Sequence, residues 1–160
     1  PHVDPALIKK ALRFAALAHA GQYRKSGKPF IYHGIQTATI LADLNLDSTM
    51  IACGILHDVV EDTDVTPEEV EDEFGKEIGN IIAGLTKIAT LHLQSPEERQ
   101  AENFRNMLLY TARDVRVIIV KFADRLHNMR TLRFLPAAKR RKIWTARRRK
   151  LWIRSMPNRS

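Results

Sequence analysis

Gly54-Ile55-Leu56-His57-Asp58-Val59-Val60-Glu61-Asp62 is the stretch that decides the fold and points to the chemistry. An apolar run, residues 50–56, leads directly into a histidine and an aspartate, and a second acidic pair follows one helical turn later. This order predicts a helix that is buried at first and then opens into a cleft. Ionisable side chains are costly in a core, because each needs a partner or a metal once it loses water. We therefore expect the rest of the chain to complete a cation site around this stretch.

The composition bounds the class of protein. With 160 residues, 44% of them hydrophobic, the chain suits one globular domain with a real core. The formal charge of +8 is uneven: residues 139–160 hold ten Lys or Arg and no acid, whereas residues 1–138 carry 16 basic and 18 acidic side chains. The basic character therefore belongs to the tail, and we expect no nucleic-acid partner for the domain as a whole.

The sequence also carries signals about location. There is no apolar run of 18 residues, and the pattern at residues 1–4 is not that of a signal peptide, so no membrane partner is expected. The single cysteine, Cys53, lies in an apolar stretch and cannot form an internal disulfide bond. A reducing, cytoplasmic setting is the simplest expectation.

Helix signals recur along the chain and predict an all-α fold. Asp4-Pro5 and Asp47-Ser48 are typical helix starts, and capping boxes stand at residues 66–69 and 95–98. Apolar spacing places a loop at residues 88–94 and a basic helix after Pro136. The first helix, after Asp4-Pro5, is expected to end near residue 20. The other expected helices cover residues 35–44, 49–60, 67–74, 76–86, 96–111 and 115–129.

The last of these segments needs an argument, because its run of β-branched residues could form a strand on propensity alone. Its neighbours are helical, and residues 123–130 have helical spacing, which favours a long buried helix. The chain shows no internal repeat and no alternation of strands and helices.

Four residues from separate parts of the chain are candidates for one cation site. Asp124 and Asn128 are four apart and share one face of the 115–129 helix. If that face meets the end of the 49–60 helix, Asp124 joins His57 and Asp58, and His33, at a loop–helix junction, can point into the same cleft. Two imidazoles and two carboxylates suit Mn²⁺, Fe²⁺ or Zn²⁺ better than Ca²⁺.

Further charged residues could serve chemistry beside such a site. Glu61 and Asp62 lie one turn beyond His57 and could orient or deprotonate an attacking water molecule. Arg24, Lys25 and a nearby lysine supply positive charge in a loop beside His33, as a phosphate-rich ligand would need.

Simpler interpretations remain open at this point. Adjacent histidine and aspartate occur by chance on many surfaces, Asp124 could pair with a neighbouring arginine, and a cationic loop is usually solvated. We interpret His19, His92 and His127 as structural or surface residues, although His127 is close to the candidate site.

Longer strings give the chain a family resemblance. His57-Asp58, with the distant Asp124 and the upstream His33, resembles the HD superfamily of metal-dependent phosphohydrolases. The chain is similar, over about residues 6 to 138, to the hydrolase domain of the RelA/SpoT homologues, which make and destroy the alarmones ppGpp and pppGpp. The strings that carry this likeness are Arg24-Lys25-Ser26-Gly27, residues 55–63, Phe74-Gly75, residues 100–103 and residues 121–132.

The resemblance implies an HD-domain helical bundle with a defined set of roles. His33, His57, Asp58 and Asp124 match the metal ligands, and the family's usual metal is Mn²⁺. Glu61 and Asp62 match the acidic pair that acts on the attacking water. Arg24, Lys25 and Ser26 match the loop against the guanine nucleotide, and Asn128 and Thr131 match contacts on the opposite wall. The implied reaction is hydrolysis of the 3′-pyrophosphate, which gives pyrophosphate and GDP or GTP.

The sequence departs from the family pattern in three respects. Gly34 replaces the usual proline after the first histidine, which we expect to loosen the helix start. The synthetase domain is absent from this chain. The match stops near Arg141, so we expect an HD-type hydrolase domain at residues 1–142 and a basic tail at 143–160, where Trp144 and Trp152 could cover apolar surface in a homo-oligomer.

Three alternatives remain beside alarmone hydrolysis. The chain could be an HD phosphohydrolase that acts on another nucleotide, or a non-catalytic nucleotide-binding module weakened by its altered C-terminus. The basic helix at residues 139–150 could instead bind nucleic acid.

Overall fold

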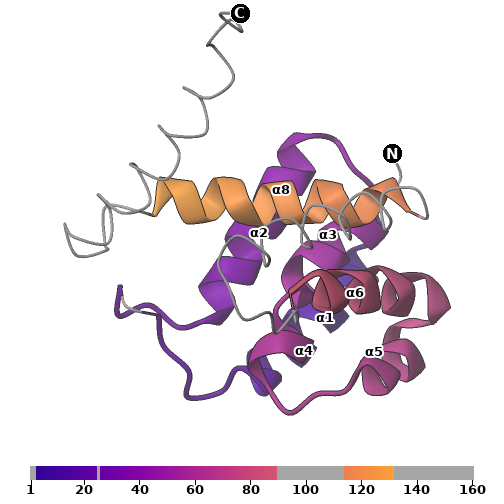
Figure 1. Ribbon diagram of the computed structural model, residues 1–160, viewed down its shortest axis with the longest axis horizontal. Coiled ribbons are helices and arrows are strands. Elements are labelled where there is room, and N and C mark those ends of the chain that lie inside the picture. The colour runs from indigo at the N-terminus through magenta and orange to yellow at the C-terminus, as the bar shows by residue number, and fades with distance from the viewer. Residues whose placement is uncertain (1–2, 25, 90–113, 132–160) are drawn as a thin grey trace, which may run out of the picture. The chain divides into compact units, whose positions relative to one another are not determined.

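The structure is a computed structural model that describes residues 3–24, 26–89 and 114–131. Within these ranges the regular elements are all helices, so the predicted all-α fold is confirmed (Figure 1). None of these helices is both long enough and apolar enough to cross a lipid bilayer. The chain divides into two compact units, residues 1–127 and 128–160. The helices are α1 (Pro5–Ala18), α2 (Ile31–Asp43), α3 (Ser48–Leu56), α4 (Val59–Asp62), α5 (Pro67–Phe74), α6 (Lys76–Ala89) and α8 (Val115–Arg130).

Helix α3 is the centre of the first unit. It packs against α1, α2 and α6, which lie around it in Figure 1. All but one of its residues are buried, as expected of a helix that is apolar on every side. The core around it includes Leu41 from α2, Ile81 and Ile82 from α6, and Val120 from α8. The apolar run that precedes His57 therefore anchors the fold.

Two glycines let α2 and α3 approach closely. A Cβ atom on Gly54 would lie 2.6 Å from Leu41 Cδ1 and 3.0 Å from Ala38 Cα. A Cβ atom on Gly34 would lie 2.6 Å from the backbone oxygen of Ile55. Gly34 lies in α2, which begins before it at Ile31, and its missing side chain permits this contact; a looser helix start stays a prediction.

The predicted helix starts are confirmed at three positions. Asp4 accepts hydrogen bonds from the amides of Ala6 and Leu7, and Asp47 accepts one from the amide of Met50. Thr66 and Glu69 form the reciprocal capping box, with distances of 2.7 and 3.2 Å. These bonds satisfy amides that have no partner within the helix.

The predicted helix at residues 49–60 is wrong in one respect. It breaks into α3 and α4 at His57 and Asp58. His57 Nδ1 lies 2.8 Å from the backbone oxygen of Gly54. In a continuous helix this oxygen would accept a hydrogen bond from the amide of Asp58, so the imidazole competes with that amide. Both residues keep backbone angles in the right-handed helical region, so the break is a local one.

Other boundaries differ by a few residues. α1 ends at Ala18 and not near residue 20, α2 begins four residues earlier than predicted, and α6 continues through Ala89 into the expected loop. The choice of helix over strand at residues 115–129 is confirmed by α8. The predicted helix at 96–111, the rest of the loop at 90–94, and the basic helix after Pro136 lie outside the described residues.

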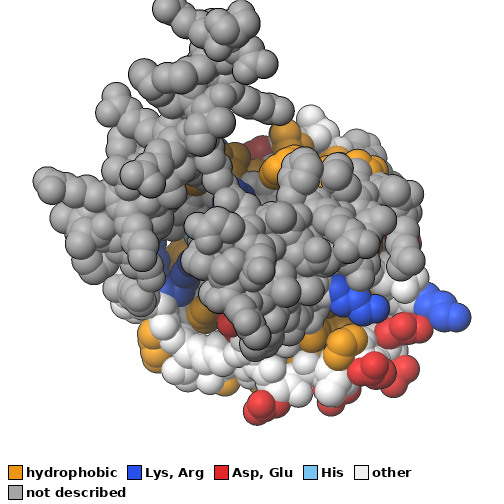
Figure 2. Space-filling view, in the orientation of Figure 1, with side chains coloured by type: hydrophobic (Ala, Val, Ile, Leu, Met, Phe, Trp, Pro, Cys, Tyr) orange, Lys and Arg blue, Asp and Glu red, His pale blue; other side chains and the backbone are white. Residues whose placement is uncertain are grey.

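Acidic side chains gather on the side of the first unit where α5 lies (Figure 2). One of them, Glu73, forms a 3.0 Å ion pair with Lys10 of α1, and the Lys10 ammonium also lies over the ring of Phe74. The acidic residues at the start of α5 complement the helix dipole.

The close approach of α2 and α3 predicts that Gly54→Val is destabilising by about 1–3 kcal/mol, because the added atoms meet backbone as well as side-chain atoms. The matched control is Ala42→Val at an exposed position of α2, which should cost less than about 0.7 kcal/mol. Urea unfolding followed by circular dichroism measures both. Equal stability of the two variants would contradict the packing described.

Candidate metal centre

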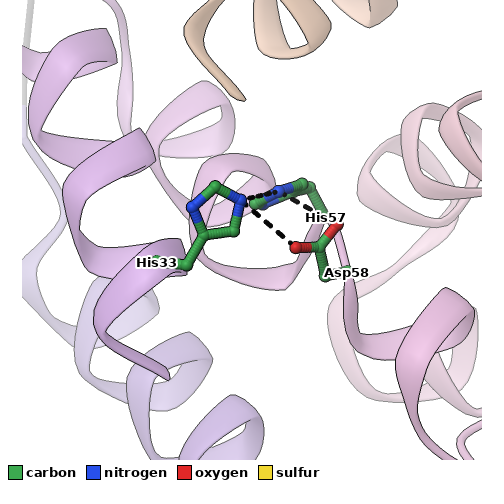
Figure 3. A group of neighbouring side chains, drawn as sticks. All are labelled: His33, His57 and Asp58. Carbon is green, nitrogen blue, oxygen red and sulfur yellow. Dashed lines mark hydrogen bonds and ion pairs between the residues drawn. The ribbon is translucent and has the colours of Figure 1, made fainter. Parts of the chain in front are cut away.

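Three donor groups, from His57, Asp58 and Asp124, converge on a fourth, Nε2 of His33. This nitrogen lies 3.2 Å from His57 Nε2 and 3.3 Å from Asp58 Oδ2. It also lies 3.1 Å from Asp124 Oδ1. Figure 3 shows His33, His57 and Asp58 facing one another. The other three residues that the sequence pointed to thus each contact His33, although the role of all four as metal ligands stays a prediction.

The elements deliver these side chains from three directions. His33 comes from the first turn of α2 and not from a loop–helix junction, whereas His57 and Asp58 occupy the break between α3 and α4. Asp124 comes from α8, whose residues Val120 and Ala123 enter the core on the same side. The two imidazoles are 2–3% exposed, so the cluster lies at the base of the site.

The charges of the cluster are mutually dependent. Burial alone would raise the pKa of Asp58, but its hydrogen bond with His57 and the positive charges of His57, His33 and Lys121 together outweigh burial and lower that pKa to about 2. Burial opposes the charged form of His57 as well, yet Asp58 and Asp124 raise the pKa of this imidazole above its ordinary value. Burial lowers the pKa of His33. The carboxylates therefore remain ionised and need positive charge between them.

The donor set fits a divalent transition-metal ion. Atoms of His33, His57 and Asp58 lie within 4.8 Å of one another, and Asp124 Oδ1 lies 3.9 Å from His57 Nε2. Lone pairs this close repel unless a proton or a cation lies among them. Two neutral imidazole nitrogens and two carboxylates are ligands that such an ion accepts.

Glu61 and Asp62 lie on α4, immediately after the cluster. The Glu61 side chain is 23% exposed, and its carboxylate forms a 3.5 Å ion pair with Lys121 of α8. Burial raises the pKa of Glu61 although Lys121 opposes the shift. Burial and the charge of Asp58 also raise the pKa of Asp62. Both carboxyl groups are thus better proton acceptors than ordinary ones.

The cationic loop forms a closed turn before α2. The amide of Arg24 donates to the backbone oxygen of Lys28 at 2.9 Å, and Gly27 provides a left-handed conformation with φ of 78°. The Arg24 guanidinium lies 5.7 Å from the centre of the Phe30 ring, and that ring is nearly perpendicular to the ring of His33. Ser26 is exposed in the turn. Lys25 lies outside the described residues.

The remaining predicted contacts belong to the second unit. Asn128 and Thr131 are at the end of α8, where the Thr131 hydroxyl donates to the backbone oxygen of Asn128 at 3.1 Å. Their role as substrate contacts stays a prediction.

Sequence reasoning missed Lys121 and Gln22 near the site, and it interpreted His127 as a structural or surface residue while noting that it is close to the site. His127 Nδ1 lies 2.5 Å from His33 Nδ1. Lys121 pairs with Glu61, and the Gln22 side chain joins His19 to the backbone oxygen of Asp62, with distances of 2.9 and 2.8 Å. Helical spacing offered one signal, because Lys121 and His127 are three residues to either side of Asp124.

Comparison with known proteins assigns the family. The HD-domain family matches residues 11–151, most of the chain. The chain belongs to the HD-domain family. The resemblance to the RelA/SpoT homologues is also confirmed, since this HD-domain chain is similar to several proteins of that kind.

Two curated relatives and one solved structure illustrate the likeness. The chain is 52% identical over 143 residues to a probable guanosine-3′,5′-bis(diphosphate) 3′-pyrophosphohydrolase of Synechocystis sp. This alignment covers 89% of this chain and 18% of the relative. It is 47% identical over 147 residues to a GTP pyrophosphokinase of Myxococcus xanthus, and this alignment covers 89% of this chain and 19% of the relative. The HD-domain chain therefore spans less than a fifth of the length of these relatives.

The solved structure is described as a metazoan ortholog of SpoT that hydrolyzes ppGpp and plays a role in starvation responses. Its TM-score is 0.72 at 28% sequence identity, and the alignment covers 91% of this chain and 83% of the other. The predicted HD-domain helical bundle is consistent with this likeness.

The ion pair between α4 and α8 predicts the effect of removing its cation. Lys121→Met should raise the pKa of Glu61 further, because the lysine ammonium favours the ionised carboxylate. Carboxyl ¹³C NMR titration of Glu61 measures the shift. Lys10→Met, which removes the partner of Glu73 on α5, is the matched control and should leave Glu61 unchanged. A fall in the Glu61 pKa in Lys121→Met would contradict the geometry.

Proposed function

We propose that this HD domain is a guanosine-3′,5′-bis(diphosphate) 3′-pyrophosphohydrolase, which hydrolyses ppGpp and pppGpp to pyrophosphate and GDP or GTP. One observation carries the proposal: the side chains of His57, Asp58 and Asp124 meet at His33 Nε2, and the next helix carries a pair of carboxyl groups with raised pKa values. The names of the relatives support the choice of substrate.

His33, His57, Asp58 and Asp124 would hold one divalent cation, and we propose Mn²⁺. When bound, such an ion supplies charge neutralisation for a phosphate group and a lower pKa for a water molecule. The chain's own contribution is a set of buried donors already oriented by helix packing, so little reorganisation accompanies binding.

Glu61 and Asp62 act on the attacking water. A Glu61 carboxylate oxygen takes a proton from the water, whose oxygen bonds to phosphorus while the bond from phosphorus to the ribose 3′ oxygen breaks. The 3′ oxygen gains a proton, which balances the one that Glu61 accepted. A carboxyl group with a raised pKa is a better base at neutral pH, and the Lys121 ion pair orients it. Asp62 orients the same water.

The substrate's phosphates and base require other contacts. Arg24, Lys25 and Ser26 would bind the guanine nucleotide from the loop before α2, and Arg24 contributes positive charge beside His33. Asn128 and Thr131 would bind it from the end of α8. A guanosine nucleotide is thus the proposed partner, and the proposed setting is cytoplasmic.

The proposed extent of the hydrolase domain is residues 1–142, followed by a basic tail at 143–160. The boundary falls outside the described residues. A homo-oligomer formed through the tryptophans of the tail is part of the same proposal.

The purified chain should release pyrophosphate from ppGpp with Mn²⁺ and not after chelation. Comparison with dGTP and cyclic nucleotides tests the substrate class. A preference for these would indicate a general HD phosphohydrolase, and nucleotide binding without any pyrophosphate release in excess Mn²⁺ would indicate a non-catalytic module. Binding of DNA that weakens with salt would support the nucleic-acid alternative.

Two substitutions separate the roles at the site. Asp124→Ala should lose both bound Mn²⁺ and hydrolysis, because it removes a carboxylate in contact with His33. Glu61→Gln should keep the ion and lower kcat by about 10²–10⁴-fold, because an amide cannot accept the proton. Metal analysis and single-turnover rates measure the two effects.

Asp43→Ala, at the exposed end of α2, is the matched carboxylate control and should resemble the unmodified protein. An Asp124→Ala protein that retains a full equivalent of Mn²⁺ would show that the ligand set is wrong. An undiminished kcat in Glu61→Gln would show that Glu61 is not the base.

A further inference from the structure

A fifth ionisable side chain contacts the cluster from behind. His127 is buried, and its Nδ1 lies 2.5 Å from Nδ1 of His33. The two rings meet nitrogen to nitrogen, with centroids 4.7 Å apart and an angle of 29° between their planes. His33 is therefore contacted through both nitrogens: Nε2 faces the other donors, and Nδ1 faces His127.

We propose that His127 is a positioning residue, which accepts a hydrogen bond from His33 Nδ1–H and so directs the His33 Nε2 lone pair into the cation site. An imidazole that gives the Nε2 lone pair to a cation carries its hydrogen on Nδ1. In a buried site this hydrogen needs an acceptor, and Nδ1 of His127 lies at the required place. His127 then carries its own hydrogen on Nε2.

His57 is oriented in the same way as His33, but a different acceptor lies at its Nδ1. Its Nε2 faces Asp58 and His33, and its Nδ1 lies 2.8 Å from the backbone oxygen of Gly54. Both histidines of the cluster thus direct Nε2 inward and have Nδ1 held from outside. For His57 the acceptor is fixed by helix α3, whereas for His33 it is supplied by a side chain of α8.

The geometry distinguishes this role from two others. A further metal ligand would direct a nitrogen toward the donors around His33 Nε2, but Nδ1 of His127 meets the opposite side of the His33 ring. A residue that only fills space would need no nitrogen at this position. The inference rests on the proposed cation site, because it assigns a function to the orientation of a proposed ligand.

The test is Mn²⁺ affinity, measured from the electron paramagnetic resonance signal of the free ion. His127→Phe keeps an aromatic ring and removes the acceptor, so Mn²⁺ should bind about 10- to 100-fold more weakly. His127→Asn is the matched variant, since its side-chain oxygen can take the place of Nδ1, and it should bind more tightly than His127→Phe. Circular dichroism without metal checks that both variants fold.

Each outcome decides the proposal. Weaker binding in a folded His127→Phe, with recovery in His127→Asn, supports it. Unchanged affinity in His127→Phe overturns it, and so does an equal loss in both variants, which would indicate packing alone. If the unmodified protein binds no Mn²⁺, the proposed cation site fails as well, whereas binding that is insensitive to His127 overturns only this inference.

A second measurement needs no variant. In the Zn²⁺-loaded protein, which is diamagnetic, ¹⁵N NMR of the histidine rings reports the tautomers. We expect His33 to carry hydrogen on Nδ1 and His127 on Nε2. Hydrogen on Nδ1 of His127, with none on Nδ1 of His33, would overturn the inference even if His127→Phe does not fold.

Discussion

Two carboxylates and two imidazoles meet inside an apolar helical bundle, and the rest of the structure depends on how their burial is tolerated. Isolated charges in such a place would oppose folding strongly. Here each group contacts at least one other: Asp58 and Asp124 both approach His33, and His57 approaches both carboxylates. The cluster is therefore stable only as a unit. A cation that binds it would add stability to the fold as well as chemistry, because the unfolded chain does not hold these donors together.

The separation between the histidines is set by helix packing. Gly34 lies next to His33, and its missing side chain allows α2 to approach the backbone at Ile55, two residues before His57. Gly54 permits a close approach to Ala38, one turn after Gly34 on α2, and also provides the carbonyl that His57 Nδ1 contacts. The residues that make the core dense thus also bring two Nε2 atoms within 3.2 Å of each other.

Much of this arrangement follows from the sequence, and the exceptions have physical causes. Helix starts at Asp4, Asp47 and Thr66 were predictable because capping is local. The break at His57 was not, since it depends on a side chain that competes for a backbone carbonyl within an otherwise helical pattern. The family resemblance predicted that His33 and Asp124 lie close together, and they are in contact in the structure. The sequence placed His127 near the site but did not predict its contact with His33, because that contact spans 94 positions and a histidine on a buried helix face has no pattern that marks its partner.

Helix α8 shows why packing and chemistry cannot be separated in this domain. Its apolar residues Val117, Val120 and Ala123 enter the core, and the polar side chains between and beside them reach three different elements. Lys121 contacts α4 through Glu61, Asp124 contacts the start of α2 and the α3–α4 break, and His127 contacts α2 through His33. A small rotation of α8 about its axis would alter all of these contacts together. The apolar side chains fix that rotation. The same core contacts therefore position three side chains: Lys121, which pairs with the proposed base; Asp124, a proposed ligand; and His127, which contacts the proposed ligand His33.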